Sequence, residues 1–108
     1  MFSALPITPR YKMLLSYDIK NGMHSIYYRY VVSEFVPSLN EMGVYVTEAW
    51  HTAYGNYPVR MVEYVAEDLA TLHSVLASDR WLELERRLKA FTIGYERKII
   101  RYRNGFQF

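Results

Sequence analysis

The 108-residue chain contains no cysteine, only four prolines and only five glycines. Without cysteine, the protein can form no disulfide bridge, no cysteine-ligated zinc site and no iron–sulfur cluster, and it has no thiol nucleophile. The fold must therefore be stabilised by an apolar core, for which a hydrophobic fraction of 51% is sufficient. We expect a single domain, because domains typically contain roughly 100 to 150 residues.

The sequence also lacks a strong net charge, a long apolar run and a spacing typical of metal ligands. A net charge of +2 is too weak to indicate nucleic acid, and no apolar run is long enough to span a bilayer. The first ten residues do not resemble a signal peptide, so we expect a cytoplasmic protein with neither nucleic acid nor a membrane as partner. His24, His51 and His73 fit no HxH or HExxH spacing, so we expect no metal and no cofactor.

What the sequence has in excess is tyrosine, with eleven residues, together with apolar side chains in two periodicities. Period-two alternation predicts four strands, near residues 11–19, 44–53, 58–65 and 95–103. Steps of three and four residues predict a helix over residues 24–42, which Pro37 should kink or break. Two further helices are predicted before the last strand, the second starting after Ser78 and ending at Gly94.

The order of these elements, βαββαβ, is typical of the ferredoxin-like α+β fold, in which helices cover one face of a four-stranded antiparallel sheet. Residues 54–57 predict a hairpin turn. Residues 1–10 are expected to form an extended lead-in, residues 11–103 the domain and residues 104–108 a short tail. The predicted strands carry apolar or aromatic side chains on both faces, so the second face needs a partner. We therefore expect a two-fold homodimer whose sheets stack face to face.

Several short motifs resemble those of the NIPSNAP-like proteins, a family of the dimeric α/β barrel superfamily. They are Trp-His-Thr-Ala-Tyr-Gly-Asn at residues 50–56, a strand ending in Glu63-Tyr64, Glu-Asp-Leu at residues 67–69 and Asp-Arg-Trp at residues 79–81. The resemblance implies a dimeric α/β barrel with one pocket per subunit between the sheet and its helices. That superfamily includes cofactor-free monooxygenases, lactone isomerases and haem-degrading enzymes, and most NIPSNAP-like proteins have no assigned reaction.

Aromatic residues are the candidates for lining such a pocket. We expect Trp50, Tyr64 and Trp81 to line it, with Tyr28 and His24 near its mouth. A tyrosine hydroxyl can hydrogen-bond a carbonyl or phenol ligand, but tyrosine is above all a large amphipathic filler. Most of the remaining tyrosines are therefore expected in the core or at an interface.

His51 is a candidate general base, because an imidazole titrates near neutral pH. The alternative is a histidine held by a structural hydrogen bond at a strand end or at the dimer interface. Neighbours on a strand point to opposite faces, so strict alternation places Trp50 on the face of Val44 and Val46 and His51 on the other.

Glu63 falls on an apolar strand face, where an ionised carboxylate is costly unless it is paired. Arg60 and Arg97 are the expected partners, and an unpaired Glu63 would be a candidate catalytic acid or base. A strand bulge or an exposed edge is the alternative explanation for a carboxylate at this position.

Two functions from different classes are compatible with these observations. The first is a homodimeric small-molecule-binding protein of the NIPSNAP-like type, with an aromatic or apolar ligand and a monooxygenase-like or isomerase-like reaction. The second is a non-catalytic interaction or scaffolding dimer, in which the same aromatic residues only fill the core. RNA binding on the sheet is disfavoured, because residues 57–65 lack the Gly- and Phe-rich motif of such domains.

Overall fold

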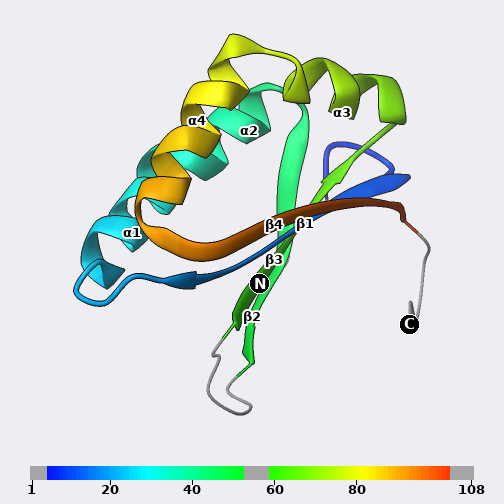
Figure 1. Ribbon diagram of the computed structural model, residues 1–108. Coiled ribbons are helices and arrows are strands. Elements are labelled where there is room, and N and C mark those ends of the chain that lie inside the picture. Colours follow the sequence, from blue (N-terminus) through cyan, green and yellow to red (C-terminus); the bar gives the residue numbers. More distant parts are fainter. Residues whose placement is uncertain (1–4, 53–58, 103–108) are drawn as a thin grey trace.

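The computed structural model describes residues 5–52 and 59–102, which form one sheet with helices gathered on one side of it (Figure 1). The elements follow the chain as β1 (Tyr11–Ile19), α1 (His24–Tyr30), the π-helical turn η1 (Val31–Phe35), α2 (Val36–Glu41), β2 (Val44–Thr52), β3 (Val59–Ala66), α3 (Leu69–Leu76), α4 (Asp79–Ala90) and β4 (Thr92–Arg101). The strands pair antiparallel in the order β2-β3-β1-β4. The predicted ferredoxin-like α+β fold is thus confirmed, while the predicted turn at 54–57 and tail at 104–108 lie outside the described residues.

The apolar core lies between the sheet and the helices. Alternate side chains of β1 are buried in it, namely Met13, Leu15, Tyr17 and Ile19. The helices add the opposing layer, which includes Phe35, Leu39, Leu72, Trp81, Leu84 and Leu88. Each large apolar side chain contributes roughly 1.5–3 kcal/mol when it leaves water, so this layer supplies the stabilisation that disulfides cannot.

The long helix predicted around Pro37 is divided into α1, a π-helical turn and α2. Proline has no backbone N–H and clashes with the preceding turn, so an uninterrupted α-helix is disfavoured there. The backbone N–H of Val36 bonds the carbonyl oxygen of Val31, five residues earlier, and Pro37 occupies the first turn of α2. The predicted interruption is confirmed, and it takes the form of a π-turn placed before the proline.

The two helices between β3 and β4 begin at side-chain caps. The Asp68 carboxylate accepts a hydrogen bond from the backbone N–H of Thr71 at 2.7 Å, and Ser78 Oγ accepts one from the N–H of Trp81 at 3.1 Å. These caps satisfy N–H groups that have no partner within a helix. The start predicted after Ser78 is confirmed, and it sets the rotation of α4 that buries Trp81 completely.

An extra residue in β2 interrupts the regular pairing with β3. Val46 pairs with Tyr64, but Glu48 pairs with Glu63, so Thr47 and Glu48 together oppose a single residue. This arrangement is a β-bulge. Because side chains alternate along a strand, one extra residue exchanges the faces of all the side chains that follow it.

The β-bulge changes where Trp50 and His51 lie. Trp50 pairs with Met61 on the face of the sheet away from the helices, whereas His51 pairs with Arg60 on the helix side. The prediction that Trp50 shares a face with Val44 is therefore wrong, because strict alternation does not hold across the bulge. We call the face away from the helices the outer face; it carries Lys12, Leu14, Tyr45, Trp50, Met61, Glu63, Val65 and Ile100.

A second bulge places Gly94 inside β4 rather than at the end of α4. Between the pairs Ser16–Glu96 and Asp18–Ile93, two residues of β4, Gly94 and its neighbour, oppose one residue of β1. Gly94 has a φ of 67°, a conformation that glycine adopts at little cost and that this type of bulge requires. The prediction that Gly94 ends the preceding helix is wrong, because the helix ends at Ala90 and the strand begins at Thr92.

Candidate functional site

The sequence-predicted site residues belong to two different faces of the sheet. The helix side holds His24, Tyr28, His51, Tyr64 and Trp81, whereas the outer face holds Trp50 and Glu63. Tyr64 and Trp81 are fully buried, while His24, Tyr28 and His51 are exposed. The structure therefore brings five of the seven residues to one side, two of them in the interior and three at the surface.

Four tyrosines, Tyr17, Tyr27, Tyr64 and Tyr95, form a cluster between the sheet and the helices, which we call the tyrosine cluster. The hydroxyl groups of Tyr17 and Tyr27 hydrogen-bond each other, and their ring centroids are 5.7 Å apart. Tyr17 also stacks on Tyr95, with a centroid distance of 6.2 Å. Tyr64 interacts electrostatically with the other three hydroxyl groups. The cluster thus groups phenolic hydroxyls that come from three strands and one helix.

Burial raises the pKa of every member of the tyrosine cluster above the ordinary value of 10.0. The cause is the loss of hydration, which disfavours the charged phenolate. Neighbouring hydroxyls raise the pKa of Tyr17 further. These groups therefore stay protonated at neutral pH, where they can donate hydrogen bonds but cannot act as bases.

Three buried polar atoms on the helix side have no hydrogen-bond partner within the described parts of the chain. They are Tyr64 Oη, Trp81 Nε1 and Arg60 Nε. Such atoms are rare in folded proteins, and each one calls for an explanation such as a bound water or ion. Phe35 lies between the rings of Tyr64 and Trp81, with centroid distances of 5.9 and 5.8 Å, so these two donors belong to one aromatic wall of the core.

Arg60 connects the interior to the exposed residues at this end of the sheet. Its Nη2 donates a hydrogen bond to the hydroxyl of Tyr28, and its guanidinium lies 5.1 Å from the ring of Tyr28 and 5.7 Å from that of Tyr27. Arg60 also pairs across the strands with His51. The structure thus places the predicted site residues Tyr28 and His51, together with Tyr27, around Arg60.

Glu85 supplies a carboxylate to the helix side, and this carboxylate is already engaged. It accepts hydrogen bonds from the Tyr95 hydroxyl at 2.6 Å and from Arg97 Nη1 at 2.7 Å. The guanidinium of Arg97 also lies 5.8 Å from the ring of Trp81. The charges of Glu85 and Arg97 therefore neutralise each other.

On the outer face, Glu63 is paired with Lys12 rather than with an arginine. Glu63 Oε1 lies 3.1 Å from Lys12 Nζ, and Thr47 Oγ1 donates a hydrogen bond to Glu63 Oε2 at 2.7 Å. The predicted partners Arg60 and Arg97 are wrong, because both lie on the helix side of the sheet. An unpaired carboxylate, which was the condition for a catalytic role, is thus not present at Glu63.

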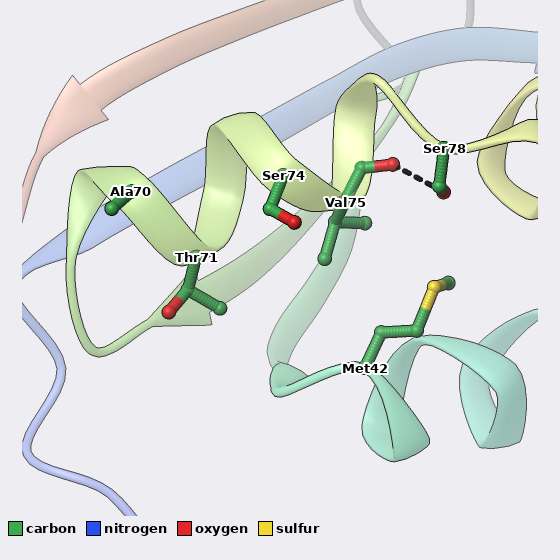
Figure 2. A pocket seen from close by; sticks show the side chains of 6 residues that line it. All are labelled: Met42, Ala70, Thr71, Ser74, Val75 and Ser78. Carbon is green, nitrogen blue, oxygen red and sulfur yellow. Dashed lines mark hydrogen bonds between the residues drawn. The ribbon is translucent and has the colours of Figure 1, made fainter.

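Two of the surface grooves, the larger ones described for this chain, lie apart from the tyrosine cluster. One, with a volume of about 500 Å³, is lined by Met42, Ala70, Thr71, Ser74, Val75 and Ser78. Figure 2 shows side chains of α3 facing Met42 across this groove. None of its six lining residues has an acidic or basic side chain, so it offers no acid–base chemistry. The other groove, of about 580 Å³, runs along β2 and is lined by Thr47, Glu48, Ala49 and Trp50.

The sequence alone does not identify Arg60, Tyr17, Tyr27 and Tyr95 as site residues. A partial signal exists, because Tyr17 lies on the apolar face of its strand at period two. Arg60 has no such signal, since its position opposite His51 depends on the bulge in the neighbouring strand. Within residues 5–52 and 59–102, no three His, Asp or Glu residues are grouped to hold a metal ion, and no helix is long and apolar enough to cross a membrane.

Comparison with known proteins finds no matching family model and no matching curated protein. Solved structures do match. A NIPSNAP family protein of unknown function from Agrobacterium tumefaciens has a TM-score of 0.62 at 16% identity, with 87% of this chain and 88% of that chain covered. An uncharacterized NIPSNAP domain protein from Burkholderia xenovorans has a TM-score of 0.64 at 12% identity, with 90% and 98% covered. SnoaB, a cofactor-independent oxygenase from Streptomyces nogalater, has a TM-score of 0.66 at 11% identity, with 91% and 97% covered. The chain therefore has the fold of NIPSNAP family proteins, which this oxygenase shares.

Proposed function

We propose that this chain is a NIPSNAP-like small-molecule-binding protein whose ligand site lies on the helix side of the sheet. The observation that carries the proposal is the set of three buried donors without a partner in the described residues, beside the tyrosine cluster. Leaving a buried polar group unpaired costs roughly 1–3 kcal/mol, so a ligand that satisfies these donors is stabilised there. The fold shared with NIPSNAP proteins is compatible with this placement, but fold alone does not define function, so the placement depends on these donors.

The residues of the helix side divide naturally into binding and chemical roles. In this proposal Tyr64 and Trp81 bind the ligand in the interior, and Tyr28 and His24 flank the entrance. His51 is the candidate general base, because the tyrosine hydroxyls stay protonated at neutral pH and histidine is the side chain that most often transfers protons in catalysis. The reaction would be monooxygenase-like or isomerase-like, and one protein of the same fold is described as a cofactor-independent oxygenase.

The outer face is proposed to pair two copies of the chain. It carries apolar side chains beside the Lys12–Glu63 ion pair, and Trp50 remains 40% exposed in the single chain. Stacking two such faces would cover Trp50 and the partly exposed side chains of this face and close a dimeric barrel. Sedimentation velocity should then give about twice the chain mass of 12.9 kDa, and a stable monomer would contradict this part of the proposal.

Native mass spectrometry of the purified protein tests the ligand site directly. We expect a small molecule to be retained by the wild type and lost or weakened in Tyr64→Phe. The matched control is Tyr30→Phe, because Tyr30 is equally aromatic and buried but its hydroxyl already donates to the carbonyl oxygen of Leu84 at 2.7 Å. If no small molecule binds in a broad screen, the alternative is favoured, in which the chain is a non-catalytic interaction or scaffolding dimer.

A further inference from the structure

Arg60 carries a positive charge for which the described residues provide no ion pair. The ion pairs of the described chain use Lys12, Arg80, Arg86, Arg87 and Arg97. Arg60 instead contacts neutral groups, namely the hydroxyl of Tyr28 and the rings of Tyr27 and Tyr28. Its Nε is buried, and Glu85, a carboxylate on the helix side, is already neutralised by Arg97. A half-buried cation in this situation is stabilised by an anion.

The three helix-side atoms that have no partner among residues 5–52 and 59–102 are all able to donate a hydrogen bond. Trp81 Nε1 and Arg60 Nε can only donate, and the protonated Tyr64 hydroxyl can donate as well. A complementary ligand therefore offers acceptor oxygens rather than N–H groups. The rings of Tyr27 and Tyr28 lie beside Arg60, and the ring of Phe35 lies beside Tyr64 and Trp81. Aromatic surface therefore flanks each of these donors and favours a ligand with an aromatic body.

We propose that the ligand is an aromatic compound with an anionic oxygen, such as a carboxylate or phenolate, held by Arg60. This inference rests on the proposed function, because it names the ligand class of the same site. The anion would replace the missing counter-charge of Arg60, and the guanidinium would bind it through Nε and a terminal nitrogen in the bidentate geometry that arginine favours. Arylalkyl amines, which are cationic at neutral pH, are disfavoured, because a second cation would face Arg60.

Three naphthalene probes of similar size test the charge preference at neutral pH: 2-naphthoate, the neutral 2-naphthylmethanol and the cationic 2-naphthylmethylamine. Binding is measured by isothermal titration calorimetry on the full chain. We expect 2-naphthoate to bind about 10- to 100-fold more tightly than the amine, the ratio that one charge-assisted hydrogen-bonded contact provides. The alcohol should bind with intermediate affinity.

Three variants locate the binding. Arg60→Met should weaken 2-naphthoate by about 10- to 100-fold, and Arg60→Lys, which keeps the charge without the bidentate geometry, should weaken it less. Arg86→Gln is the matched control, since it removes an exposed arginine whose partner is Glu83 on the same helix. Far-UV circular dichroism tests whether each variant folds. If Arg60→Met does not fold, the weaker binding of 2-naphthoate by Arg60→Lys tests the inference instead.

The outcomes separate this inference from the proposed function. Preference for the amine, or equal affinity for all three probes, overturns the anionic ligand class and leaves a small-molecule site in place. Loss of 2-naphthoate binding in Arg86→Gln but not in the Arg60 variants also overturns the inference, because binding would then be on the surface. If no probe binds and native mass spectrometry finds no retained ligand, the proposed function fails as well.

Discussion

Removal of one member of the Lys12–Glu63 ion pair should destabilise the fold strongly. The two charged atoms are 3.1 Å apart, and the side chains are only 9% and 10% exposed. At an effective dielectric constant of about 20 their attraction is about 5 kcal/mol, and the desolvation of both ions offsets much of it. Lys12→Met leaves a buried carboxylate with the Thr47 hydroxyl as its described partner, so the free energy of unfolding should fall by about 3–5 kcal/mol.

A double-mutant cycle measures how much of this loss belongs to the pair. In Lys12→Met/Glu63→Met both charges are replaced by apolar side chains, so no ion is left buried and stability should return to within about 1 kcal/mol of the wild type or exceed it. Urea denaturation followed by far-UV circular dichroism gives these values. The protein concentration is held constant, because dimerisation would add a concentration-dependent contribution.

The result that would refute this reasoning is a small effect of the single substitution. If Lys12→Met costs less than about 1 kcal/mol, the pair behaves like an exposed one and the carboxylate is hydrated. Thr47→Val provides a milder test where Lys12→Met does not fold. It removes one hydrogen bond to the Glu63 carboxylate and should cost about 1.5–3 kcal/mol.

Three further predictions concern Gly94, the buried tyrosines and Asp68. Gly94→Ala should lower the free energy of unfolding by roughly 1–2 kcal/mol in urea denaturation, since the added Cβ meets no atom within 4 Å and only the positive φ is unfavourable; unchanged stability would mean that the bulge rearranges. Burial raises the pKa of Tyr30 to about 12 and raises that of Tyr17 further. The contribution of these tyrosines to the free energy of unfolding is therefore present below pH 10 and is lost as pH rises above it. Absorbance at 295 nm should show these tyrosines ionising only at high pH, together with unfolding. The N–H of Thr71 lowers the pKa of Asp68 below 3.8, so the stabilisation by this cap is present above that pH and is lost as pH falls. Asp68→Ala should make the melting temperature less dependent on pH in the acid range, and an unchanged slope would contradict the cap.

Much of the fold is predictable because it depends on local pattern. The period-two apolar face of β1 and the Ser78 cap are properties of neighbouring residues, and the structure confirms both. Two predictions are wrong for one reason: the face of Trp50 and the role of Gly94 both depend on a β-bulge, and a β-bulge depends on how two strands pair. Thr47 and Gly94 carry little local information about this pairing, so alternation alone cannot reveal it.

The candidate site is less predictable than the fold, because its members come from distant segments. Tyr64 and Trp81 are found from the sequence as large aromatic residues, but Phe35, which joins them, stands out only in three dimensions. The partner of Glu63 is missed for the same reason, since Lys12 reaches it diagonally across β1 and β3. The dimer remains a prediction that sedimentation can test.

The extra residue at Thr47 also affects how related sequences should be compared. In a relative whose β2 has no bulge, the tryptophan and the histidine would have to come one residue earlier in the strand than Trp50 and His51 do here to reach the same two faces. An alignment without a gap at this point would match Trp50 to a residue of the opposite face. Evolutionary comparison of this strand therefore needs to follow strand pairing: a single-residue deletion at Thr47 would remove the bulge and still leave Trp50 opposite Met61 and His51 opposite Arg60, whereas an insertion or deletion elsewhere in the strand would exchange their faces.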